Sequence, residues 1–200
     1  MLIVISSGRI LVGTMDLLSS HTKKIQRLEF ACDGLADIKK FLQVDSGPLP
    51  LLHTLTVKGT MGSSREDRDA IDSSNPPLLS NVVNLKAFYF HSDLCQPPFI
   101  NHSAFSSLQL TLFDLLAARS GNFRPSQLLN FIGASPMLQR VHMRIIGRVP
   151  LDDISQDRVI VLRSLETFTV VSTDGRGDSE FATHIVPFSK IHLDCTQDAR

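Results

Sequence analysis

The sequence lacks the features that mark several classes of protein. It has no tryptophan, one tyrosine and three cysteines in 200 residues, and its 20 Lys and Arg residues balance its 20 Asp and Glu residues. A formal charge of zero excludes the strongly basic character typical of chains that bind nucleic acid or anionic membranes. No apolar run approaches the roughly 20 residues that a membrane-spanning helix needs. We therefore expect neither a nucleic-acid partner nor a membrane.

The cysteines are too few for a disulfide scaffold. Cys32, Cys95 and Cys195 are also too far apart for a paired zinc site, so we interpret them as free thiols in a reducing compartment. The first residues, Met1 to Gly8, have no positively charged segment, and their apolar run is too short for a secretory signal. This pattern predicts a cytoplasmic or nuclear location.

The composition nevertheless predicts a folded chain, with 42% hydrophobic and 20% charged residues. Its length suits one domain or one short array of repeats. None of the patterns G-x-S-x-G, G-x-G-x-x-G, H-E-x-x-H or the P-loop occurs. We therefore predict no enzymatic activity, no catalytic residue and no cofactor.

A short motif recurs along the chain. It has the form apolar-x-x-apolar-x-apolar and matches at seven places, namely Ile25/Leu28/Phe30, Leu52/Leu55/Val57, Leu85/Phe88/Phe90, Phe105/Leu108/Leu110, Leu138/Val141/Met143, Leu165/Phe168/Val170 and Phe188/Ile191/Leu193. The first positions are 27, 33, 20, 33, 27 and 23 residues apart, an irregular version of the leucine-rich-repeat period. The alternation at the end of each motif predicts one short strand with one buried face.

Helical or loop-like segments separate these strands. Residues 35–42, 112–118 and 126–133 have helical character, whereas residues 62–77 are charged, small and proline-terminated and predict a surface loop. The expected fold is α/β, an irregular leucine-rich-repeat solenoid with a curved parallel sheet backed by short helices and loops. We expect residues 1–24 to form an N-terminal cap, residues 25–195 the repeat domain and residues 196–200 a C-terminal tail.

Three stretches carry a more specific signal, residues 49–57, 128–141 and 159–168. The second joins a Leu-Phe helix through Ser135-Pro136 to Leu138, and the third places Val161-Leu162 before Leu165-Glu166. In this order they resemble the carboxyl-terminal, leucine-rich-repeat-like region of fungal F-box proteins, over roughly residues 25 to 195. The resemblance implies the substrate-recognition part of a ubiquitin-ligase subunit.

The F-box that defines this family is a helical segment that engages the ligase adaptor, and the first 24 residues contain none. We therefore predict a protein-interaction module that binds a protein substrate, with a ligase adaptor as partner only if an F-box lies upstream. The alternative is a truncated or degenerate structural fragment without a partner.

The polar positions of each motif should line the concave face of the sheet. They are Arg27, Glu29, Thr54, Thr56, Lys58, Tyr89, His91, Gln109, Arg140, His142, Arg144, Thr167, Thr169, Lys190, His192 and Asp194. We expect no metal there, because His91, His142 and His192 lie on alternate strands, roughly 10 Å apart. The face is either merely solvated or a binding surface. In the second case we predict that Tyr89, His91, Arg140, His142 and Arg144 bind an acidic or phosphorylated protein segment.

Overall fold

The computed structural model describes residues 2–6, 21–32, 49–59, 82, 84–92, 109–117, 125–145, 154–155, 158–173, 178–187 and 192–194. The predicted helix over 35–42, the loop over 62–77 and the tail over 196–200 lie outside these residues. So do Cys95, Cys195, Lys190 and most of the predicted cap.

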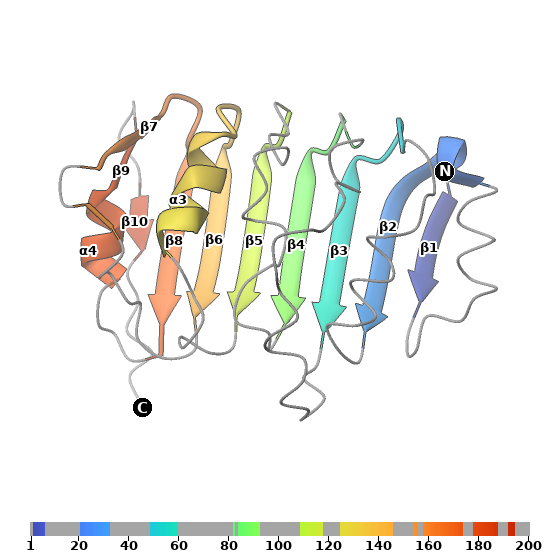
Figure 1. Ribbon diagram of the computed structural model, residues 1–200, viewed down its shortest axis with the longest axis horizontal. Helices are drawn as coiled ribbons and strands as arrows, with labels where there is room; N and C mark the ends of the chain where they lie inside the picture. Colours follow the sequence, from blue (N-terminus) through green and yellow to red (C-terminus); the bar gives the residue numbers. More distant parts are fainter. Residues whose placement is uncertain are drawn as a thin grey trace.

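Eight parallel strands form one sheet whose order follows the chain (Figure 1). They are β1 (Leu2–Ser6), β2 (Ile25–Cys32), β3 (Thr54–Gly59), β4 (Ala87–Ser92), β5 (Leu112–Ala117), β6 (Arg140–Ile145), β8 (Thr167–Ser172) and β10 (His192–Asp194). Each strand pairs in parallel with the next in this order. The predicted α/β class with a parallel sheet is therefore confirmed.

The recurring motif explains this arrangement. Its second apolar position forms one row of the core across the sheet, where Leu28, Leu55, Phe88, Phe113, Val141 and Phe168 pair in register. All six side chains are buried. The next buried row is two residues further along, because side chains alternate between the faces of a strand. Phe88 stacks on Phe113 in the first row, with ring centroids 5.8 Å apart.

A ladder of backbone hydrogen bonds joins the repeats where the strands begin. The His53 carbonyl accepts from the amides of Lys86 and Ala87, and the Lys86 carbonyl accepts from Thr111 and Leu112. The same pattern of hydrogen bonds recurs at the carbonyls of Thr111 and Gln139, each of which accepts from two amides of the next repeat. The carbonyl always follows the first apolar residue of its motif, so each repeat fixes the start of the next strand.

The fourth repeat differs from the prediction. The predicted motif at Phe105/Leu108/Leu110 and the predicted helix over 112–118 are both wrong, because residues 112–117 form β5. Leu110, Phe113 and Leu115 occupy the motif positions, and all three are buried. Gln109 lies in the turn before the strand and not on the concave face. The sequence does not show the alternating pattern of a strand here, because Leu112 and Leu116 add apolar residues on the second face.

The last strand is also displaced from its predicted register. β10 pairs Leu193 with Phe168, whereas the predicted motif aligns Leu193 with Val170. The shift is two residues, so it preserves which residues alternate toward each face of the strand.

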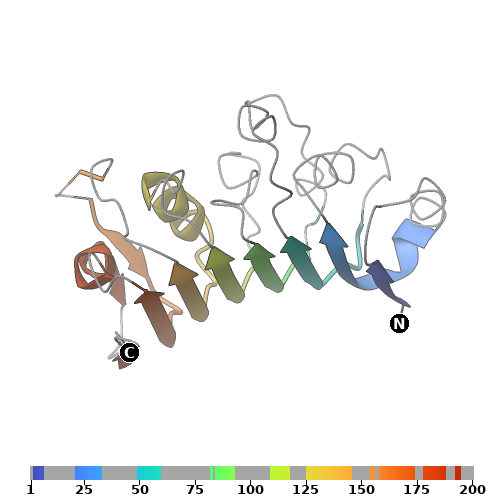
Figure 2. The ribbon, with the colours of Figure 1, turned by 90° about the horizontal axis from the view of Figure 1, so that it is seen from below.

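One helix covers the core beside β5 and β6. Helix α3 (Pro125–Gly133) confirms the helix predicted over 126–133, and its Leu128, Leu129, Phe131 and Ile132 are buried. The Phe131 and Phe113 rings are 4.8 Å apart. Seen along the strands, the sheet follows a shallow arc with α3 on its convex side (Figure 2). No described helix lies over the concave face, which we call the open face.

The Ser135-Pro136 junction ends α3. The buried Ser135 hydroxyl donates to the Phe131 carbonyl at 3.1 Å, and the Ser135 carbonyl accepts from the Leu138 amide. The hydroxyl thus satisfies one of the carbonyls that a helix leaves without a partner at its C-terminal end. The chain then turns directly into the motif that precedes β6.

A second, two-stranded sheet and two short helices were not anticipated. Strands β7 (Ile160–Leu162) and β9 (Ile185–Pro187) pair in parallel, next to α4 (Asp178–Thr183), and η1 (Thr22–Lys24) precedes β2. Arg158, just before β7, donates to the Ser126 carbonyl and the Asn130 side chain of α3. This contact ties the small sheet to the helix layer.

Candidate interaction surface

The open face presents its side chains in three rows that run across the strands. The central row consists of Glu29, Thr56, Tyr89, Asp114, His142 and Thr169, which are in register from β2 to β8. The rows on either side contain Arg27, Thr54, Ala87, Leu112, Arg140 and Thr167, and Ala31, Lys58, His91, Leu116, Arg144 and Val171. The described part of this face is therefore mixed in polarity, with its charges at defined places.

All five residues predicted to bind a partner lie on this face. Arg140, His142 and Arg144 alternate along β6 with buried residues and are exposed, whereas Tyr89 and His91 on β4 are half-buried. Strand β5 separates the two groups, as the repeat order predicts. The Tyr89 and His91 rings meet edge to face with centroids 6.3 Å apart.

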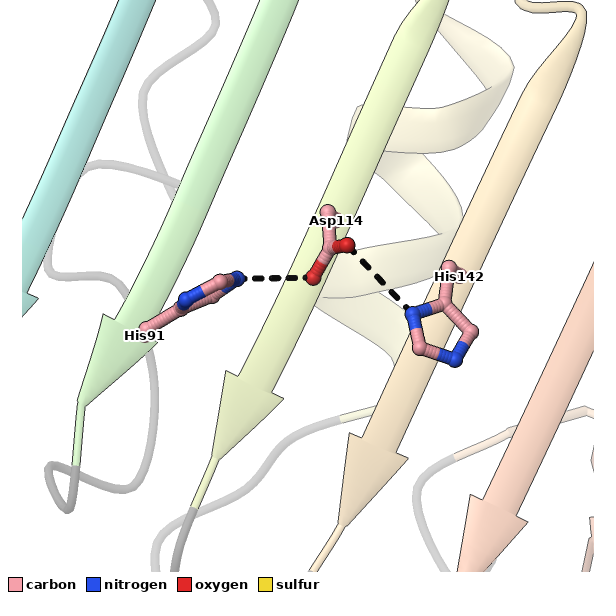
Figure 3. A network of polar contacts seen from close by, with 3 residues as sticks. All are labelled: His91, Asp114 and His142. Atoms are coloured by element: carbon pink, nitrogen blue, oxygen red, sulfur yellow. Dashed lines mark hydrogen bonds and ion pairs between the residues drawn. The ribbon is translucent and has the colours of Figure 1, made fainter.

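A sixth residue, Asp114 on β5, connects the two groups (Figure 3). Its carboxylate accepts from His91 Nε2 at 2.9 Å and from His142 Nδ1 at 3.4 Å. The exposed fractions of the side chains are 24% for Asp114, 34% for His91 and 53% for His142. We call these three residues, with Tyr89, Arg140 and Arg144, the central patch.

Sequence reasoning missed Asp114 because it placed the fourth strand too early. The signal was present, since Leu110, Phe113 and Leu115 have the same spacing as the other motifs. With that choice the first positions of the motifs from Leu85 to Leu165 are 25, 28 and 27 residues apart, more regular than 20, 33 and 27. The regular spacing would have put Asp114 between Tyr89 and His142.

Asp114 also determines which nitrogens of the two imidazoles carry protons. An ionised carboxylate only accepts hydrogen bonds, so His91 donates from Nε2 and His142 donates from Nδ1. In the neutral rings, Nδ1 of His91 and Nε2 of His142 are then unprotonated. Either ring can take up a proton at this second nitrogen without breaking the hydrogen bond that its first nitrogen makes to Asp114. Protonation of both rings changes the charge of the trio from negative to positive.

The arginines of the central patch have uncharged neighbours on either side. Arg140 is in register with Leu112 and Thr167, and Arg144 with Leu116 and Val171. Among the described side chains of the two flanking strands, Asp114 is the one acid on the open face. This part of the open face is therefore suited to an anionic group.

A separate ion pair lies nearer to β1. Lys58 on β3 donates to Glu29 on β2 at 2.6 Å, and Arg27 lies 3.6 Å from the same carboxylate. The hydrogen bond from Lys58 lowers the pKa of the Glu29 carboxyl and outweighs the opposing effect of burial. Lys58 and Glu29 thus form a charge pair within the face.

Two kinds of site are not found in the described part of the chain. No three His, Cys, Asp or Glu side chains among the described residues are placed to hold a metal ion. No helix within those residues is long and apolar enough to cross a membrane.

Comparison with known proteins adds no relative. No family model, no curated protein and no solved structure matches this chain.

Proposed function

We propose that this chain is a protein-interaction module, an irregular leucine-rich-repeat solenoid whose open face binds an acidic or phosphorylated segment of a partner protein. The column of Arg140, His142 and Arg144 on β6 carries this proposal, because it places two guanidinium groups and an imidazole at alternate, exposed positions of one strand. Guanidinium groups bind carboxylates and phosphates through two parallel hydrogen bonds.

The repeating architecture supports the proposal independently of the patch. The parallel strands follow one another in chain order, and before successive strands one backbone carbonyl accepts hydrogen bonds from two amides of the next motif. Stacked repeats use the extended open surface of such a sheet for binding. The resemblance to F-box proteins suggests that such a surface recognises a ligase substrate. A ligase adaptor becomes a partner only if an F-box lies upstream.

Binding of short peptides to the purified chain tests the proposal. Acidic, phosphorylated, neutral and basic peptides of equal length are compared by fluorescence anisotropy at low and physiological salt. We expect the acidic and phosphorylated peptides to bind best, and their affinity to fall as salt screens the charges. The double variant Arg140→Ala/Arg144→Ala should lose more than about tenfold in affinity, since hydrogen bonds between charged groups are removed.

A matched control separates the patch from overall charge. Lys23→Ala/Lys24→Ala removes the same number of positive charges from exposed residues of η1 and should leave the affinity unchanged. If the two double variants lose the same amount of peptide affinity, the loss arises from net charge alone, and the assignment of the site is overturned. No binding by any peptide would favour the alternative, a structural fragment without a partner.

A further inference from the structure

The spacing of side chains along β6 constrains the partner more closely. Arg140, His142 and Arg144 are at alternate positions of one strand. Their Cα atoms are therefore about 6.6 Å apart from one member to the next, and those of the two arginines are about 13 Å apart. The column thus offers three successive positions for acidic groups, one over each of its side chains. Side chains at every second position of an extended peptide repeat at the same interval of about 6.6 Å.

From this match we infer that the partner is an extended segment with acidic side chains at positions i, i+2 and i+4, lying along β6. The inference rests on the proposed function and names the chemistry of its partner. The outer acids face Arg140 and Arg144, and the middle acid faces His142. Acids at consecutive positions would not fit equally well, because neighbouring side chains of an extended peptide point to opposite sides.

Binding of the middle residue of the segment, at i+2 above His142, should depend on pH. At neutral pH an acid above His142 also meets the Asp114 carboxylate, which is bonded to His142 and His91. Within the described ranges, the other charged groups facing the trio are Lys58 from β3, in register with His91, and Arg140 and Arg144 on β6. From β8, the uncharged Thr169 faces His142. Histidine takes up its proton between about pH 8 and pH 5, so acidification makes this position attractive to an acid.

The trio therefore discriminates between middle residues in a manner that depends on pH. A segment with acids at i and i+4 and glutamine at i+2 is accepted at neutral pH. A segment with a third acid at i+2 binds tightly only after the imidazoles are protonated. Glutamate itself stays ionised down to about pH 5, because its ordinary pKa is about 4.3, so the change arises on the protein side.

Four labelled peptides of equal length test this inference by fluorescence anisotropy at pH 7.5 and pH 5.5. Their acidic patterns are E-x-E-x-E, E-x-Q-x-E, the block E-E-E with the same charge as the first, and a single phosphoserine. We expect E-x-E-x-E to gain about five- to tenfold in affinity at pH 5.5, as for one or two added charges. The peptide E-x-Q-x-E should gain less than about twofold, and the block should bind more weakly than E-x-E-x-E at pH 5.5.

Asp114→Asn removes the negative charge with little change in shape. At pH 7.5 it should bind E-x-E-x-E more tightly than the original chain does at that pH, because the trio is then neutral and no longer negative. His91→Gln/His142→Gln should abolish the gain at low pH, whereas His21→Gln, which alters an exposed histidine beside η1, should retain it. Thermal unfolding followed by circular dichroism confirms that each variant is folded.

The results separate this inference from the proposed function. If acidic peptides bind but the block or the phosphoserine peptide binds as well as E-x-E-x-E at pH 5.5, the spacing is overturned and the proposed function stands. An equal gain at low pH for E-x-E-x-E and E-x-Q-x-E overturns the role of the trio. If no peptide binds at either pH, the proposed function fails as well.

Discussion

Glu29 and Asp114 are carboxylates in the same row of the open face, yet their partners differ. Glu29 faces a permanent cation, Lys58, at 2.6 Å, whereas Asp114 faces two histidines whose charge depends on pH. The first pair therefore keeps its charges across the neutral range. The Asp114 site instead joins its carboxylate to two imidazoles on the neighbouring strands.

Replacing Glu29 should reveal a small contribution to stability that disappears in acid. The pKa of Glu29 is lowered in the folded chain, so the contribution is complete above the ordinary glutamate pKa of about 4.3 and is lost as the pH falls through the folded value. Because Lys58 is 52% exposed, Glu29→Gln should lower the free energy of unfolding by only about 0.2–1 kcal/mol at pH 7. Urea denaturation at pH 7 and pH 3 measures this. A larger difference at pH 3 would contradict it.

At the scale of single elements, β5 shows where sequence reasoning succeeds and fails. Motifs with polar residues between the apolar ones, such as those of β4 and β6, predict both a strand and the direction of its side chains. In β5 only Asp114 is polar among residues 112–116, so the pattern fits a helix as readily as a strand. What determines the outcome is the pairing of β5 with β4 and β6, which is not local. Asp114 was missing from the predicted site for the same reason, because its segment was not recognised as a strand.

Two substitutions in β5 test the strand directly. Phe113 is fully buried and packs against Phe88 and Phe131, whereas Leu112 is half-buried on the open face. We expect Phe113→Ala to lower the free energy of unfolding by roughly 3–5 kcal/mol. Leu112→Ala should cost less than half as much, since it removes less buried area. Chemical denaturation of both variants provides the comparison, and equal costs would contradict the alternation of a strand.

At the scale of the whole molecule, the order of the strands could be predicted, but the small second sheet could not. The order follows from a motif that recurs with a connection long enough for the crossover that a neighbouring parallel strand requires. Sheet β7/β9 has no such motif. It depends on contacts such as the bond from the Ile160 amide to the His184 carbonyl, which joins residues far apart in the sequence. Short strands held by tertiary contacts leave little trace in local periodicity.

This architecture also predicts how the molecule opens. In the sheet formed by the described strands, each strand pairs with its neighbours in the order, so the end strands β1 and β10 have one described partner each. β10 is further limited to three paired residues. Local opening should therefore begin at the ends and proceed inward, because an end strand is held by a neighbour on one side and an inner strand by neighbours on both.

Native-state hydrogen exchange followed by mass spectrometry measures this order. We expect the amides of β10 to exchange first and those of β1 next, while β4 and β5, buried in the middle of the array, exchange most slowly. Phe88→Ala should accelerate exchange in β3, β4 and β5 most strongly, since Phe88 lies in the core row that joins them. Uniform exchange across all eight strands would instead indicate one cooperative unit, in which the end strands are as stable as the centre. That result would contradict a stability built from one repeat to the next.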